Sequence, residues 1–301
     1  MRKGILFAIS AYVMWGLFPL YWKQLQAIPA KEIVAHRIVW SLVFLGIIIS
    51  SKKQIVRTLK TIRKPRIIAI YTCSASLIFV NWLTYIWAVN SGYIVDASLG
   101  YFINPLVSVL LGIIFFRERL RVGQWIAILL ACAGVGYLTF KYGALPWIGL
   151  VLAFSFGTYG LIKKLAPLEA LEGQTIEMAF LTIPALSFLI YLETHHRASF
   201  GHAGFTPSLL LILGGAVTAI PLLMFSAAAR QIPLSMIGIL QYLAPSLQFS
   251  IGVWVYGESF PTYKLVGYSF IWSALLVYTI EGLRHQQKSR KAMESLEIPP
   301  T

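Results

Sequence analysis

Long apolar stretches, separated by short polar connections, run along almost the whole chain. We expect ten of them, each of about 18 to 23 residues and so long enough to cross ~30 Å of hydrocarbon as a helix. They lie near residues 4–22, 31–50, 67–89, 94–116, 123–140, 146–163, 173–192, 207–228, 234–255 and 262–282. Their apolar positions are continuous and do not alternate, which excludes the strands of a membrane barrel. The pattern therefore predicts an all-α membrane protein, because a helix satisfies its own backbone hydrogen bonds in lipid.

The composition agrees with this pattern. Of 301 residues, 58% are hydrophobic and 12% are charged, whereas a soluble domain has about twice that charged share. Cys73 and Cys132 are the only cysteines and both lie in apolar stretches, so we expect neither a disulfide framework nor a thiolate metal cluster. The apolar stretch after Arg2 and Lys3 continues to Trp22 without a small-residue cleavage site, which predicts a retained first span and not a signal peptide.

The net charge of +14 is by itself typical of a nucleic-acid binder. The positions of the basic residues contradict that reading, because 19 Lys and Arg lie on the N-terminal side of the predicted spans and 5 on the opposite side. Since basic loops stay in the cytoplasm, we expect both termini to be cytoplasmic and no nucleic-acid partner. The basic connection 52–66 either contacts anionic membrane lipids or serves only to set the topology.

The chain repeats itself at an offset of about 140 residues. Pro105, Gly112 and Glu118 recur with the same spacing as Pro245, Gly252 and Glu258. Five spans per copy is an odd number, so the second copy must cross the membrane in the opposite sense. We therefore expect two inverted-topology five-helix repeats, at 1–143 and 144–283, and a cytoplasmic tail at 284–301. Inverted halves can exchange between inward-open and outward-open states around a midplane site.

Four segments carry a family resemblance: EIVAHRIVWS (32–41), NWLTYIWAVN (81–90), ASLGYFINPLVSVLLGIIFFRERL (97–120), and PLLMFSAAAR followed by QYLAP (221–245). With them the chain resembles RarD-type permeases, in the EamA branch of the drug/metabolite transporter (DMT) superfamily, over essentially its whole length. The resemblance implies ten helices in the bacterial inner membrane. It also implies transport of a small organic solute, such as a drug-like compound, an amino acid or another metabolite, with export as the expected direction.

Polar and aromatic residues near mid-depth form the expected substrate site. Pro105 lies ~16 Å into its span, where a proline removes one backbone hydrogen bond and frees a carbonyl, and Pro245 is expected to do the same in the other half. Inverted-repeat transporters bind substrate between such broken helices. The expected site comprises Trp15, Asn81, Trp82, Tyr101, Asn104, Pro105, Tyr159, Gln241, Tyr242 and Pro245. The alternatives are tolerated kinks for the prolines and interfacial or packing roles for the aromatic residues.

Four ionisable residues lie inside spans: Glu32, His36 and Arg37 in the second, and Glu177 in the seventh at a repeat-related position. A charge there costs ~2.5–3.5 kcal/mol, so these side chains should face protein or water. Because a histidine beside a carboxylate can titrate near neutral pH, we expect all four to act in gating or in coupling to a proton gradient. An ion pair that anchors the helix is the alternative. We expect Asp96 to be the N-cap of its helix and not a substrate group.

These patterns favour a secondary transporter and not an enzyme. The sequence contains no ATP-binding motif, no G-x-S-x-G elbow and no H-E-x-x-H helix. His195, His196 and His202 share a predicted loop without the further ligands that a metal site needs, so neither metal nor cofactor is expected. A membrane sensor or scaffold is the main alternative, and a lipid-modifying enzyme the weaker one. The sequence leaves the substrate, the direction and the oligomeric state open.

Overall fold

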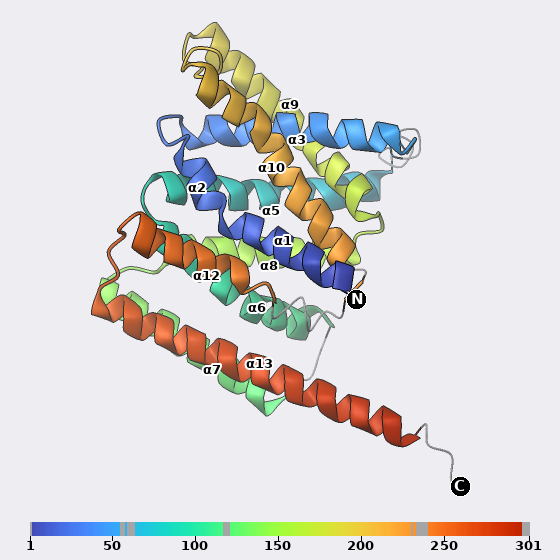
Figure 1. The fold of residues 1–301 in the computed structure, drawn as a ribbon, viewed down its shortest axis with the longest axis vertical. Coiled ribbons are helices and arrows are strands. Elements are labelled where there is room, and N and C mark those ends of the chain that lie inside the picture. Colours follow the sequence, from blue (N-terminus) through green and yellow to red (C-terminus); the bar gives the residue numbers. More distant parts are fainter. Residues whose placement is uncertain are drawn as a thin grey trace.

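The structure is a computed structural model that describes residues 2–54, 58, 64–116, 121–229, 231–232 and 240–296. Over these ranges the chain is helical and contains no strand (Figure 1). The helices are α1 (Arg2–Gly16), α2 (Phe18–Lys23), α3 (Ala30–Ser51), α5 (Pro65–Asn90), α6 (Ile94–Phe116), α7 (Val122–Tyr142), α8 (Trp147–Leu165), α9 (Ala170–Thr194), α10 (Phe205–Ala229), α12 (Leu243–Ser250), the π-helix η1 (Ile251–Val255) and α13 (Thr262–Leu296). Glu118 and part of the ninth predicted span lie outside the described residues.

The helices are those of a multi-pass membrane protein. Seven segments are long and apolar enough to cross a membrane, by length and composition: Lys3–Lys23, Ala30–Ser51, Pro65–Asn90, Val122–Lys141, Ala170–Thr194, Phe205–Phe225 and Thr262–Arg284. Three shorter apolar helices, Ile94–Val107, Trp147–Lys163 and Leu243–Val255, coincide with the three remaining predicted stretches. Large apolar side chains such as Phe140, Phe205 and Trp254 are exposed on the surface, where lipid would solvate them.

Two of the predicted spans are broken. The first divides at Leu17, between α1 and α2, and Pro19 lies in the first turn of α2, where its missing N–H has no intrahelical partner to lose. The ninth is interrupted at Gln241 and Tyr242, just before α12 begins. Pro245 is therefore the third residue of α12, and the predicted mid-helix kink at that position is wrong. Pro105, by contrast, lies inside α6.

Contacts between helices follow a paired pattern. Helix α1 packs on α10 and α12, and α8 packs on α5 and α6. Helix α3 packs on α9 and α10, and α5 also packs on α9. Helices α7 and α13 lie side by side along one edge of the molecule, at the bottom of Figure 1, while α9 and α10 extend to the opposite edge. The middle of the bundle is thus enclosed by α1, α3, α5, α6, α8, α10 and α12.

Candidate functional site

A cavity lies in the middle of the bundle. It holds about 730 Å³ of atom-free space, counted with its opening to solvent. Its lining is Tyr12, Trp15, Phe18, Arg37, Ile78, Asn81, Trp82, Tyr85, Tyr101, Asn104, Phe156, Leu222, Gln241, Ala244, Pro245 and Gln248. Seven of the ten predicted substrate residues are among them: Trp15, Asn81, Trp82, Tyr101, Asn104, Gln241 and Pro245. Pro105, Tyr159 and Tyr242 do not line it.

Aromatic rings supply seven of the sixteen residues that line the cavity. Tyr12 and Trp15 of α1 meet edge to face, with ring centroids 5.5 Å apart, and Trp15 also contacts Phe225 of α10 at 5.7 Å. On another wall Tyr101 of α6 packs between Tyr85 of α5, at 5.8 Å, and Phe156 of α8, at 6.2 Å. Rings from several helices thus present flat apolar surfaces to any solute in the cavity.

A hydrogen-bond network centred on Asn81 holds the polar part of this wall. Asn81 Nδ2 donates to the Leu152 carbonyl at 3.1 Å and to Ser155 Oγ at 3.0 Å, both on α8. Asn81 Oδ1 accepts a bond from Tyr101 Oη at 3.3 Å. Asn81 is buried, so these bonds fix its orientation and connect α5, α6 and α8 next to the cavity.

Gln248 is a lining residue that the sequence analysis missed. Its Nε2 donates to the Trp15 carbonyl at 3.0 Å, which connects α12 to α1. Its Oε1 is buried and has no hydrogen-bond partner in the described part of the chain. The available signal was a glutamine within an apolar stretch, seven residues after Gln241, since polar side chains in spans usually make bonds between helices.

Arg37, predicted to act in gating, lines the central cavity. The residue is 3% exposed, and Nε donates to Thr218 Oγ1 of α10 at 2.7 Å. The guanidinium carbon is 4.0 Å from the centroid of Trp82, 5.0 Å from Trp22 and 5.7 Å from Phe18. Nη1 is buried without an acceptor, and Arg37 makes no ion pair with any described residue. Among the described residues, the structure therefore gives no support to the alternative, an ion pair through Arg37 that anchors the helix.

Glu32 and His36 contact the connection between α9 and α10. The fully buried Glu32 carboxylate accepts bonds from Ser199 N at 2.6 Å, Ser199 Oγ at 2.9 Å and Phe200 N at 3.3 Å. The His36 ring packs on Phe200 with centroids 4.8 Å apart. Neither side chain lines the central cavity. One turn of α3 thus contacts the connection between α9 and α10, which lies far from it along the chain.

Glu177 forms a second buried cluster. Its Oε1 accepts bonds from Ser74 Oγ at 2.6 Å and Lys163 Nζ at 2.9 Å, and its Oε2 accepts one from Tyr159 Oη at 3.2 Å. These partners lie on α5 and α8, so Glu177 connects α9 to both helices. Tyr159, which was expected to bind substrate, instead donates its hydroxyl to this cluster.

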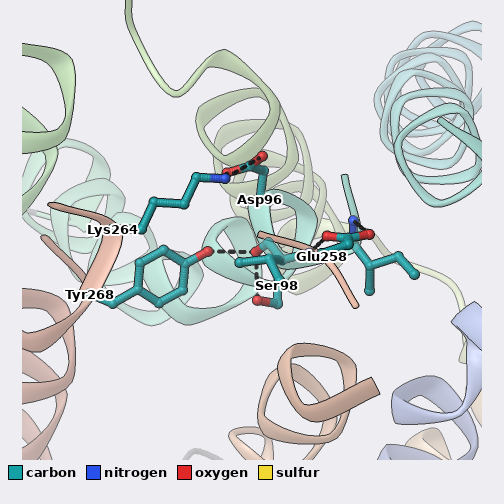
Figure 2. Close-up of polar contacts among 7 residues, drawn as sticks. Asp96, Ser98, Glu258, Lys264 and Tyr268 are labelled. Atoms are coloured by element: carbon teal, nitrogen blue, oxygen red, sulfur yellow. Dashed lines mark hydrogen bonds and ion pairs between the residues drawn. The ribbon is translucent and has the colours of Figure 1, made fainter. Parts of the chain in front are cut away.

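A third polar cluster lies where α6 begins (Figure 2). The Glu258 carboxylate accepts bonds from Ile94 N at 2.7 Å and Val95 N at 2.8 Å, and Lys264 Nζ lies 2.9 Å from Asp96 Oδ1. The predicted N-cap role of Asp96 is wrong, because α6 begins two residues earlier and Glu258 caps it. Burial raises the pKa of Glu258, and the nearby Asp96 charge adds to that rise, while the two N–H donors and Lys264 oppose it.

Further bonds hold the chain at this cluster. Tyr268 Oη of α13 donates to the Val95 carbonyl at 2.5 Å, and Ser98 Oγ donates to the same carbonyl at 2.7 Å. A second cavity, of about 670 Å³ counted in the same way, lies beside the cluster. Asp96, Lys264 and Tyr268 line it together with the rings of Trp87 and Trp147.

Sequence comparison relates the chain to membrane transporters. The EamA-like transporter family matches residues 2–140. The chain is 45% identical to "Protein RarD" of Streptomyces exfoliatus, over 98% of this chain and 93% of that protein. It is 44% identical to the "Uncharacterized transporter YojE" of Bacillus subtilis, over 96% and 97% of the two chains, and 41% identical to "Protein RarD" of Escherichia coli, over 96% and 98%.

Comparison with solved structures finds a protein of similar fold. A solved crystal structure superposes on 94% of this chain and 99% of its own with a TM-score of 0.60, at 18% sequence identity. At that identity the likeness concerns the fold alone. It extends over nearly all of both chains.

Proposed function

Because the chain belongs to the RarD-type branch of the EamA-like transporter family, we propose that it is a secondary transporter of a small organic solute. The solute crosses the bacterial inner membrane by alternating access around the central cavity, with export as the direction. One observation carries this proposal: a solute-sized cavity at the centre of apolar helices has polar and aromatic walls. Arg37 and Asn81 come from one proposed half of the chain and Phe156 and Gln241 from the other.

The pairing of helices supports two inverted halves, residues 1–143 and 144–283. In such a repeat α1 corresponds to α8, α3 to α9, α5 to α10, α6 to α12 and α7 to α13. Under this relation the contact of α1 with α10 corresponds to that of α8 with α5, and the contact of α1 with α12 to that of α8 with α6. The contact of α3 with α10 likewise corresponds to that of α9 with α5. The family match over residues 2–140 agrees with a boundary near 143.

The membrane orientation follows from charge. The 19 to 5 distribution of Lys and Arg supports cytoplasmic termini, with the tail 284–301 on that side. Glu258, the cap of α6, then lies at the outer face. In this orientation the basic connection 52–66 faces anionic lipid headgroups of the inner leaflet.

Glu32, His36 and Glu177 act as gates in this proposal. Glu32 and Glu177 are repeat-related, and each carboxylate accepts three hydrogen bonds from neighbouring elements. Protonation of Glu32 would remove acceptor capacity from its contacts with Ser199 and Phe200 and so loosen the α9–α10 connection. A proton gradient can therefore drive the cycle through Glu32. His36 takes part in the same movement, because its ring packs on Phe200 in the α9–α10 connection.

Solute counterflow into proteoliposomes tests the transport proposal. Labelled drug-like compounds, amino acids and other metabolites should include at least one that exchanges with saturation. Asn104→Ala and Gln241→Ala should reduce that exchange, because both residues line the cavity. Gln26→Ala, at an exposed position, is the matched control and should exchange like the wild type. Wild-type exchange in both cavity variants would reject this cavity as the pathway.

The same assay separates the competing function classes. A sensor or scaffold would give no saturable exchange of any solute. An intramembrane enzyme would convert its ligand chemically. Recovery of the labelled solute unchanged on the far side of the membrane distinguishes transport from both.

A further inference from the structure

We infer that the central cavity binds its solute through an anionic group, a carboxylate on an apolar body, and that Arg37 is the positive partner of that carboxylate. The inference rests on the proposed function and deepens it, since it names the chemical class of the solute. It follows from the charge of Arg37, its unused donor and the residues around it.

Arg37 carries a charge that the described residues do not neutralise. A guanidinium stays protonated in proteins, and a cation inside a membrane span is stable only when it faces a partner or water. The residue is 3% exposed, and its Nε donates to the uncharged Thr218 hydroxyl. The rings of Trp82, Trp22 and Phe18 lower the energy of the cation without cancelling its charge. An anion in the cavity would supply the missing counter-charge.

The geometry leaves the guanidinium able to bind that anion. Nε is engaged by Thr218 Oγ1 at 2.7 Å, which fixes one edge of the group. Nη1 is buried without an acceptor among the described residues, and Arg37 lines the cavity. A guanidinium presents paired N–H groups that match the two oxygens of a carboxylate. The contact with Trp82 at 4.0 Å limits its rotation, so the donor stays in place before the solute arrives.

The rest of the lining selects against cations and for an apolar body. No aspartate or glutamate is among the described lining residues, so no fixed negative charge offsets Arg37 there. The amides of Asn81, Asn104, Gln241 and Gln248 are neutral. The remaining surface is largely aromatic or aliphatic, which suits a hydrocarbon or ring system. A solute with one carboxylate and an apolar remainder satisfies both parts of the cavity.

Binding of matched ligands to the purified full chain in detergent tests this inference by titration calorimetry. The probes are 3-phenylpropionate, indole-3-acetate and decanoate, each paired with its neutral primary amide, plus 2-phenylethylammonium as a cation. We expect a carboxylate to bind at least ~10-fold more tightly than its amide, and the cation not to bind. Arg37→Gln should reduce carboxylate affinity to that of the amide. Arg37→Lys keeps the charge but loses the paired N–H groups, so its carboxylate affinity should lie between those of the wild type and Arg37→Gln. Arg197→Gln, at an exposed arginine, is the matched control and should bind like the wild type.

The wild-type comparison alone can overturn the inference, whether or not the Arg37 variants fold. Equal binding of amide and carboxylate would overturn it, and so would binding of none of the three carboxylates. Chloride or phosphate that competes as tightly as the organic carboxylate would overturn the requirement for an apolar body. Counterflow of neutral solutes that is lost in Asn104→Ala, without carboxylate binding, would leave the transport proposal standing. Carboxylate binding without exchange of any solute would support the carboxylate site and contradict the transport proposal.

Discussion

The Glu258 carboxylate lies 2.7 Å from the backbone nitrogen of Ile94, a residue 164 positions earlier, and accepts its hydrogen bond. It also accepts one from Val95 N at 2.8 Å. The first N–H groups of a helix have no intrahelical partner and favour negative charge. A residue from the second half of the chain therefore caps a helix of the first half. This contact ties the connection before α13 to the start of α6.

Removal of this cap should lower the stability of the protein. We expect Glu258→Ala to cost about 1 kcal/mol, the usual effect of losing a helix cap, because two buried donors lose their acceptor. Glu258→Gln should cost less, since its amide oxygen still accepts a bond. The thermal unfolding midpoint of the purified protein in detergent measures the loss. Glu193→Ala removes an exposed carboxylate that contacts His202 and is the control, expected to change little. An unchanged midpoint in Glu258→Ala would show that the cap adds no stability.

The same carboxylate should give the protein a specific pH dependence. Because burial raises the pKa of Glu258, the folded protein holds this proton at pH values where the unfolded chain has already lost it. Stability due to this group is therefore complete below the ordinary glutamate pKa and is lost as the pH rises through the raised pKa. Unfolding midpoints across a pH series should show the wild type losing stability relative to Glu258→Gln as the pH rises. A relative gain with rising pH would mean that the N–H donors outweigh burial.

The elements of the fold could be predicted from the sequence better than their ends. Hydropathy located the apolar helices, because lipid demands a continuous apolar run of known length. It placed the start of α6 correctly near residue 94, but it did not show what caps that start, so Asp96 was wrongly expected to be the cap in place of Glu258. It also missed the break at Gln241 and Tyr242, because an apolar run does not show where backbone hydrogen bonds stop. Caps and breaks depend on contacts with distant residues such as Glu258.

The residue types of the candidate site could be predicted from the sequence, but their positions in the fold could not. Asn81, Trp82 and Asn104 were found because polar and aromatic residues at mid-depth are unusual in spans. Arg37 was recognised as a charge in a span, but its place at the cavity depends on Thr218 of α10 and on Trp82 of α5. Gln248 lines the cavity and bonds to the Trp15 carbonyl of α1, a contact with a distant helix that the sequence did not reveal. Sequence patterns thus gave residue types, and tertiary contacts decided their roles.

Glu32→Gln should abolish any dependence of transport on a pH gradient. The proposed role of Glu32 needs a carboxylate that can take up a proton and thereby loosen its contacts with Ser199 and Phe200. Uptake by proteoliposomes with and without an imposed gradient measures this. Ser199→Ala removes the hydroxyl bond at 2.9 Å and leaves the carboxylate intact, so it should weaken the contact but keep the gradient dependence. An unchanged dependence in Glu32→Gln would exclude Glu32 as the coupling group.

The Glu177 and Lys163 pair should respond asymmetrically to substitution. The side chain of Glu177 is 1% exposed and that of Lys163 is 24% exposed. Lys163→Met leaves a buried carboxylate without its cation, whereas Glu177→Gln leaves a lysine that water can reach. Fully buried pairs lose about 3–5 kcal/mol when one partner is removed. Since water reaches Lys163, we expect roughly 1–3 kcal/mol for Lys163→Met and less for Glu177→Gln. Denaturant unfolding in detergent would contradict this if Glu177→Gln proved the more damaging change.

A close approach of two helices should make Gly215 intolerant of a side chain. A Cβ atom there would lie 2.4 Å from the carbonyl carbon of Trp40 and 2.7 Å from Ser41 N, so α10 would have to move away from the backbone of α3. We expect Gly215→Ala to cost about 1–3 kcal/mol, as overpacking usually does. Gly46→Ala on α3 meets nothing within 4 Å and is the matched control. It should be neutral or stabilising by up to about 1 kcal/mol, because alanine is the better helix former.

The Gly215 substitution should also weaken solute binding. Thr218 follows Gly215 by three residues on α10 and holds Arg37 Nε at 2.7 Å. A shift of α10 away from α3 lengthens that bond and releases the guanidinium from its fixed orientation. Calorimetric titration of the folded fraction with 3-phenylpropionate should therefore show lower affinity in Gly215→Ala than in Gly46→Ala. Equal affinity and equal stability in the two variants would mean that α10 accommodates the methyl group without moving, and that the spacing of α3 and α10 does not control Arg37.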